Sequence, residues 1–163
     1  MRLMFMGTPE FAVPSLVAVA EAGFSVVSVV TQPDKPRGRG MKVRPTPVKE
    51  KALELGLPVM QPQRLSDPKW IAAMYELQPE IIAVVAFGQF LPKVLLELPP
   101  KGCINIHPSL LPLYRGASPI QQAILDGADE TGVTIMYLDE GMDTGDIISQ
   151  VKVPISEEDD AGM

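Results

Sequence analysis

The first thirty residues place an apolar run, a helix-forming stretch and a second apolar run in succession, and this order restricts the fold most strongly. Residues 2–6 (Arg-Leu-Met-Phe-Met) predict a buried strand. A helix is predicted over residues 11–22, with Pro14 in its first turn and Gly23 at its end. Residues 25–31 are rich in β-branched side chains and predict a second buried strand. Two strands joined by a helix pair in parallel, so we expect a parallel sheet.

The later segments continue this pattern. Residues 81–86 are apolar on both faces and predict a central strand, and residues 103–107 predict a further strand. Shorter elements are predicted as a strand at residues 58–61 and as helices at residues 46–55, 66–77, after Pro92, and 118–127. Residues 133–138 and 146–153 are too close in sequence for a crossover helix, so they should pair antiparallel. The predicted fold is α/β, a Rossmann-like, mostly parallel twisted sheet flanked by helices, with an antiparallel strand pair near the C-terminus.

Length and composition indicate one domain with an ordinary core. The chain has 163 residues and is 46% hydrophobic, which suffices for a single globular domain. No apolar run reaches the roughly 18–20 residues of a membrane span, so we expect no membrane association. The single cysteine, Cys103, cannot form an intrachain disulfide and favours a reducing compartment, the cytoplasm.

Residues 32–51 are basic in a chain whose net charge is −6. Seven lysines and arginines stand there against two acidic residues, and no aromatic residue lies between them. Prolines and glycines interrupt residues 32–45, so we expect a mobile, irregular loop of about fourteen residues, a length at which loops are often functional. A compact positive segment suits contact with an anion, although a solvated loop without a partner is the simpler alternative.

Two nucleotide-binding motifs are excluded by the sequence. The turn after the first strand has Gly7 but carries Pro9 where the dinucleotide motif Gly-x-Gly-x-x-Gly needs its second glycine. The phosphate-binding loop Gly-x-x-x-x-Gly-Lys-Ser/Thr is also missing.

A group of polar residues follows the strand at residues 103–107. Asn105 and His107, the only histidine, point to the same side of that strand because side chains alternate along it. Asp143 lies in a glycine-containing loop that could close over the same place. Ser109 lacks the Gly-x-Ser-x-Gly turn of a serine nucleophile. A site without a nucleophile suits direct transfer between two bound substrates, with the protein supplying positioning, oxyanion stabilisation and proton transfer.

Each of these residues also has a simpler structural interpretation. A lone histidine at a strand end is often only a hydrogen-bonded structural residue, and Asp143 beside glycine could be a turn former. Phe87 and Phe90 are most simply core residues. One histidine with scattered carboxylates is a poor set of metal ligands, so no metal is expected.

A longer pattern favours the catalytic interpretation. Asn-Ile-His-Pro-Ser-Leu-Leu-Pro at residues 105–112, Tyr-Arg-Gly at 114–116 and Met-Asp-Thr-Gly-Asp at 142–146 resemble the signature of enzymes that transfer formyl from 10-formyltetrahydrofolate, a consumed co-substrate. The resemblance implies that Asn105 and His107 stabilise the oxyanion and that Asp143 assists. It also implies a folate site formed by Phe87, Gly88, Gln89, Phe90, Leu91, Ser109, Leu110, Leu111, Pro112, Leu138 and Asp139.

Within that family, the basic segment resembles the methionyl-tRNA formyltransferases, in which a similar loop engages initiator methionyl-tRNA. The resemblance implies tRNA contacts by Lys35, Arg37, Arg39, Lys42 and Arg44, with Arg39 matching the loop arginine that meets the tRNA. We expect residues 1–163 to be a formyltransferase catalytic domain, incomplete at its C-terminus and without the barrel-like tRNA-binding domain of that family, and we expect a monomer. The alternatives are a 10-formyltetrahydrofolate hydrolase, a transferase with another amine acceptor, and a binding module without activity.

Overall fold

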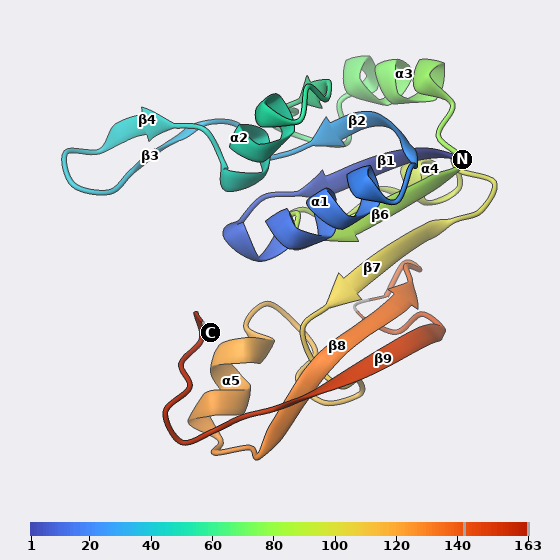
Figure 1. The fold of residues 1–163 in the computed structure, drawn as a ribbon. Coiled ribbons are helices and arrows are strands. Elements are labelled where there is room, and N and C mark those ends of the chain that lie inside the picture. Colours follow the sequence, from blue (N-terminus) through green and yellow to red (C-terminus); the bar gives the residue numbers. More distant parts are fainter. Residues whose placement is uncertain (142, 163) are drawn as a thin grey trace. The chain divides into compact units, whose positions relative to one another are not determined.

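The computed structural model describes residues 1–141 and 143–162, so Met142 of the sequence pattern and Met163 lie outside the described residues. The chain divides into two compact units, Met1–Cys103 and Ile104–Met163, and each is described by itself (Figure 1). Among the described residues, no helix is long and apolar enough to cross a membrane.

The first unit is built on a parallel sheet. Its strands are β1 (Arg2–Gly7), β2 (Ser25–Val30), β5 (Val59–Met60) and β6 (Ile81–Val85). They lie in the order β5-β2-β1-β6, and every neighbouring pair is parallel. The four predicted strands are therefore confirmed, and no strand end is shifted by more than one residue. Consecutive side chains of β1 are fully buried, which shows that the strand is covered on both faces.

Helices connect these strands and begin where the sequence predicts. They are a 3₁₀ turn η1 (Glu10–Ala12), α1 (Val13–Glu21), α2 (Pro47–Glu54), α3 (Pro68–Leu77) and α4 (Lys93–Leu96). The Thr46 hydroxyl accepts a hydrogen bond from the Lys49 amide, 3.0 Å away, and caps α2, with a proline at the first helical position. α1 and α2 pack against each other and against β2.

The basic segment differs from the prediction of an irregular loop. It forms an antiparallel hairpin of β3 (Lys35–Arg37) and β4 (Lys42–Arg44), which extends from the first unit in Figure 1. Both strands of a two-stranded ribbon are edge strands, where a proline such as Pro36 is tolerated. Gly38 and Gly40 have positive φ angles of 73° and 82° and allow the tight turn. The prolines and glycines of this segment are therefore compatible with a two-stranded ribbon.

The second unit is an antiparallel arrangement with one helix. β7 (Cys103–His107), β8 (Glu130–Tyr137) and β9 (Ile147–Pro154) lie in the order β7-β8-β9, and α5 (Pro119–Leu125) precedes β8. The predicted antiparallel pairing of the last two strands is confirmed. β7 is also antiparallel to β8, a pairing that the sequence pattern did not indicate.

The thiol of Cys103 should be inert in the folded protein. Burial raises its pKa from 9.0 to about 12, because the thiolate would lose its hydration. We predict that iodoacetamide at pH 8 labels Cys103 about a thousandfold more slowly in the native protein than in urea, measured by mass spectrometry. The folded pKa lies above the unfolded one, so this group's stabilising contribution is complete below pH 9 and is lost as pH rises toward 12. Equal labelling rates in buffer and in urea would contradict this burial.

Candidate active site

β7 ends with the only histidine of the chain, and the ring is held from both sides. His107 is 5% exposed, and it pairs with Thr134 of β8 in the strand register. Its Nε2 lies 2.8 Å from the Tyr114 carbonyl oxygen. A carbonyl oxygen can only accept a hydrogen bond, so Nε2 carries a proton and donates it to Tyr114. The other ring nitrogen, Nδ1, is left to face the 139–145 loop.

Asp143 occupies that position opposite Nδ1. Its Oδ1 is 3.6 Å from His107 Nδ1, and its Oδ2 accepts a 3.0 Å hydrogen bond from the Gly116 amide. The Asp143 side chain is 11% exposed, and its backbone has a positive φ of 52°. The structure therefore brings two of the three predicted catalytic residues together. Because Nε2 already bears a proton, Nδ1 can donate to this carboxylate only when the imidazole is doubly protonated.

Asn105 is the third of these residues, two positions before His107 and on the same face of β7. It pairs with Met136 of β8 and is half-buried. No hydrogen bond is recorded for its side-chain amide within residues 1–141 and 143–162. A half-buried amide with no recorded partner among these residues has two N–H donors that could bind another group.

The loop that carries Asp143 is fixed by its own side chains. Asp139 Oδ1 accepts 2.8 Å hydrogen bonds from the Gly141 amide and from the Thr144 hydroxyl. At Gly145, a Cβ atom would lie 1.8 Å from the Tyr137 carbonyl oxygen, so no side chain fits there. Of the predicted folate residues in this region, Asp139 is exposed and uses its carboxylate within the loop, and Leu138 is half-buried.

The turn after His107 is anchored by a buried hydroxyl. Thr134 Oγ1 donates to the Ser109 carbonyl at 2.7 Å and accepts from the Leu111 amide at 3.2 Å. Gln150 of β9, which is paired with Thr134 in the strand register, donates to the same hydroxyl and to the Leu111 carbonyl, both at 3.0 Å. The Ser109 hydroxyl is fully buried and donates to the Leu113 carbonyl at 2.6 Å. This serine is a structural residue and not an exposed nucleophile.

The predicted folate loop at residues 87–91 belongs to the first unit. The Phe87 carbonyl accepts from the Thr8 hydroxyl at 2.7 Å and from Gln32 Nε2 at 3.3 Å, so the segments after β1, β2 and β6 meet at one edge of the sheet. Phe87 is 2% exposed, which confirms its interpretation as a core residue. The same interpretation is wrong for Phe90, which is 76% exposed.

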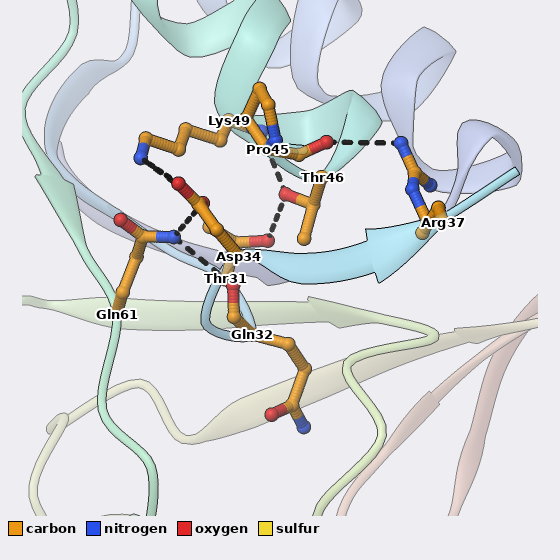
Figure 2. A network of polar contacts seen from close by, with 8 residues as sticks. All are labelled: Thr31, Gln32, Asp34, Arg37, Pro45, Thr46, Lys49 and Gln61. Carbon is orange, nitrogen blue, oxygen red and sulfur yellow. Dashed lines mark hydrogen bonds and ion pairs between the residues drawn. The ribbon is translucent and has the colours of Figure 1, made fainter. Parts of the chain in front are cut away.

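The basic hairpin is anchored at its root and exposed beyond it. Figure 2 shows Asp34, just before β3, receiving bonds from Gln61 Nε2 at 2.7 Å and from Lys49 Nζ at 3.0 Å. The hydrogen bond from Gln61, followed by the bond and charge of Lys49, holds the pKa of the Asp34 carboxyl below its usual value. Within the described part of the chain, no ion pair is recorded for the five predicted tRNA contacts, which are all exposed: Lys35, Arg37, Arg39, Lys42 and Arg44.

Comparison with known proteins now places this arrangement in a family. The sequence model of a family described as "Formyl transferase" matches residues 1–163. The chain belongs to the formyl transferase family. It is 56% identical over 162 residues to a protein of Pelotomaculum thermopropionicum named methionyl-tRNA formyltransferase, covering 99% of this chain and 52% of that protein. It is 55% identical to the protein of the same name from Caldanaerobacter subterraneus, with the same coverage. The chain thus spans about half the length of these curated relatives.

Solved structures of formyltransferases share the fold. Phosphoribosylglycinamide formyltransferase from Bacillus halodurans superposes with a TM-score of 0.78 at 29% identity, covering 99% of this chain and 84% of that one. Glycinamide ribonucleotide transformylase 1 from Geobacillus kaustophilus gives a TM-score of 0.76 at 30% identity, covering 99% and 86%. The sugar 3N-formyltransferase WlaRD, solved in the presence of 5-N-formyl-THF, gives 0.69 at 25% identity, covering 99% and 54%. The predicted mostly parallel α/β fold is confirmed.

Sequence reasoning missed two residues that support this site, Thr134 and Gln150. Burial alternates along β8, and Thr134 occupies one of its buried positions. A polar residue at a buried position of an alternating strand is a signal that could have identified it. Gln150 gave no comparable signal, because every residue of β9 is exposed. No group of three or more His, Cys, Asp or Glu residues suited to a metal ion occurs in the described part of the chain.

Replacing the buried hydroxyl should loosen the turn that follows His107. We predict that Thr134→Val lowers the free energy of unfolding by about 1–3 kcal/mol, because the Ser109 carbonyl and the Leu111 amide lose their partner. Urea denaturation followed by circular dichroism measures the change. Thr134→Ser retains the hydroxyl and should recover most of the loss. Equal stability of Thr134→Val and the unsubstituted protein would show that this hydroxyl does not anchor the turn.

Proposed function

We propose that residues 1–163 form the formyl-transferring part of an enzyme that moves a formyl group from 10-formyltetrahydrofolate to the α-amine of initiator methionyl-tRNA. The observation that carries the proposal is the arrangement on β7. A histidine ring lies between a carbonyl and a carboxylate, and two residues earlier on the same face lies an amide for which no hydrogen bond is recorded within residues 1–141 and 143–162. Family membership and the names of the curated relatives support this choice of reaction.

The proposed reaction needs no covalent intermediate on the protein. The neutral α-amine attacks the formyl carbon, a nitrogen–carbon bond forms, and the formyl oxygen becomes an oxyanion. Collapse breaks the bond from the formyl carbon to folate nitrogen N10, which takes up a proton while the former amine loses one. Asn105 would donate an amide hydrogen to the oxyanion. His107 Nε2 would donate a second bond, and Asp143 would orient the ring and assist proton movement.

This role requires His107 to exchange one partner. In the structure, the proton on Nε2 is accepted by the Tyr114 carbonyl at 2.8 Å. A formyl oxygen must replace that carbonyl as the acceptor during transfer. Asp143 Oδ1 lies opposite Nδ1, at 3.6 Å in the structure, so the ring would keep its orientation while Nε2 exchanges its acceptor.

We also propose the folate contacts that the resemblance implies. These contacts are Phe87, Gly88, Gln89, Phe90, Leu91, Ser109, Leu110, Leu111, Pro112, Leu138 and Asp139. The hydroxyl of Ser109 and the carboxylate of Asp139 already serve their own turns. The Ser109 amide and carbonyl are also engaged, with the His107 carbonyl and the Thr134 hydroxyl, so Ser109 would act by fixing the turn and Asp139 would offer backbone groups. Phe90 has the exposed ring of the set.

The exposed hairpin is the proposed tRNA contact. Its cationic side chains, Lys35, Arg37, Arg39, Lys42 and Arg44, are exposed and could neutralise phosphates, although Arg37 Nη2 also donates to the Pro45 carbonyl at 2.9 Å. A phosphate-rich acceptor would explain why an acidic chain keeps a hairpin of this charge.

The acceptor decides between this function and that of a folate hydrolase. We predict that the full-length protein carrying residues 1–163 converts charged initiator tRNA and 10-formyltetrahydrofolate to formyl-methionyl-tRNA, resolved by acid gel electrophoresis. Release of formate without formyl-methionine would instead identify water as the acceptor. Omitting the tRNA from a parallel reaction measures the background of formate release.

Removing the free amide should slow the transfer step. We predict that Asn105→Ala lowers kcat by about 10²–10³-fold, because a donor to the developing oxyanion is lost. Rapid-quench measurement under single-turnover conditions gives the rate, and the affinity for folate should stay within a few-fold. An unchanged single-turnover rate would remove Asn105 from the reaction.

The tip of the hairpin should govern tRNA affinity through charge. We expect Arg39→Ala to raise KM for tRNA several-fold and to flatten the dependence of KM on salt. The variant loses one phosphate contact, so fewer counterions are released when the tRNA binds. KM for the folate should not change. Identical salt dependence in Arg39→Ala and the unsubstituted protein would exclude this contact.

A further inference from the structure

Three glutamine side chains link the root of the basic hairpin to the 87–91 loop within the first unit. Gln32 is the first residue of the predicted basic loop and Gln89 belongs to the predicted folate site, but the sequence pattern did not connect these side chains with one another. Gln61 lies just after β5, Gln32 follows β2, and Gln89 follows β6. They come from the same edge of the parallel sheet, where the segments after the strands meet.

Gln61 forms the contact at the hairpin end. Its Nε2 donates to Asp34 Oδ1 at 2.7 Å and to the Gln32 carbonyl at 3.2 Å (Figure 2). Asp34 is the residue before the first hairpin strand, and Lys49 of α2 holds its carboxylate from another side. The start of the hairpin is therefore tied to the main chain of Gln32.

Gln32 forms the contact at the other end. Its Nε2 donates to the Phe87 carbonyl at 3.3 Å, and its Oε1 accepts from Gln89 Nε2 at 3.1 Å. Gln89 is held in turn by the Gln63 carbonyl at 3.0 Å and the Leu65 amide at 3.1 Å. One side chain thus fixes a carbonyl and a side chain of the predicted folate loop.

The fit around Gln32 is close. Gly88 has a φ of 98°, and a Cβ atom built there would lie 3.2 Å from Gln32 Nε2. A primary amide donates on one side and accepts on the other, so turning it breaks both contacts. Gln32 is half-buried, and water replaces such partners less readily than at an exposed position. A shift of the hairpin root should therefore alter the hydrogen bonds to the 87–91 loop.

We propose that Gln32 is a positioning residue for both substrates. It holds the hairpin root and the 87–91 loop in one arrangement, so binding of tRNA at the hairpin favours binding of folate at the loop, and the reverse. The proposal rests on the proposed function for the identity of the two ligands. The hydrogen-bonded connection itself stands on the contacts of the first unit alone.

Kinetics of four variants of the full-length protein test this role. Gln32→Met should raise KM for both tRNA and 10-formyltetrahydrofolate by about fivefold, because each binding site loses roughly one supporting hydrogen bond. The value of kcat should stay within twofold. Gln61→Met should raise mainly KM for tRNA, and Gln89→Met mainly KM for folate. Gln121→Met, at an exposed position of α5, is the matched control and should change neither. A Gln32→Met protein with only one altered KM, or none, would overturn the proposal.

A spectroscopic measurement tests the connection separately from the reaction. In a heteronuclear NMR spectrum, Gln61→Met should shift the side-chain amide signals of Gln32 and Gln89, although no hydrogen bond between Gln61 and Gln89 is recorded within residues 1–141 and 143–162. An unmoved Gln89 signal overturns the proposal, even where Gln32→Met fails to fold. If the unsubstituted protein makes no formyl-methionyl-tRNA, the proposed function fails, and the NMR result still decides whether Gln32 connects the two segments.

Discussion

The bond from His107 Nε2 to the Tyr114 carbonyl is the contact on which the candidate site depends. Because a carbonyl can only accept, this bond fixes which ring nitrogen carries a proton and turns Nδ1 toward Asp143. The Gly116 amide, two residues after Tyr114, holds the other oxygen of the same carboxylate. One short segment therefore sets the positions of both the ring and Asp143. Among the described residues, no hydrogen bond is recorded for the amide of Asn105, which lies on the same face of β7.

The first unit places its loops by a different constraint. Parallel strands end at a common edge, so the segments after β1, β2 and β6 must meet there, and the Phe87 carbonyl joins all three through Thr8 and Gln32. The hairpin after β2 is long enough to extend from the unit, yet its root is bound back to that edge through Asp34. A root held by hydrogen bonds, with an exposed and charged tip, suits recognition of a large anion.

The apolar patterns of the sequence predict most of the strands and helices. The same patterns do not predict the contacts between residues of the candidate site. The β-branched run at residues 25–31 and the apolar run at 81–86 became strands because continuous burial leaves few other structures. The prolines and glycines of residues 32–45 predict an irregular loop, but the structure has a hairpin there. A ribbon of two edge strands accepts proline, because an edge strand does not need every backbone N–H for pairing. Asp143 and His107 meet through the pairing of β7 and β8 and the loop that follows, a distant contact that periodicity does not reveal. Thr134 was missed for a different reason, because the alternation along β8 was not searched for a polar residue at a buried position.

During transfer, a formyl oxygen should replace the Tyr114 carbonyl as the hydrogen-bond acceptor of His107 Nε2. A crystal structure of the full-length protein with an unreactive formyl-folate analogue tests it most directly. We predict a formyl oxygen about 2.7–3.2 Å from both Asn105 Nδ2 and His107 Nε2. The Tyr114 carbonyl should then be released from His107, and Asp143 should still face Nδ1. A bound analogue whose formyl group lies away from Asn105, with His107 still bonded to Tyr114, would contradict the account.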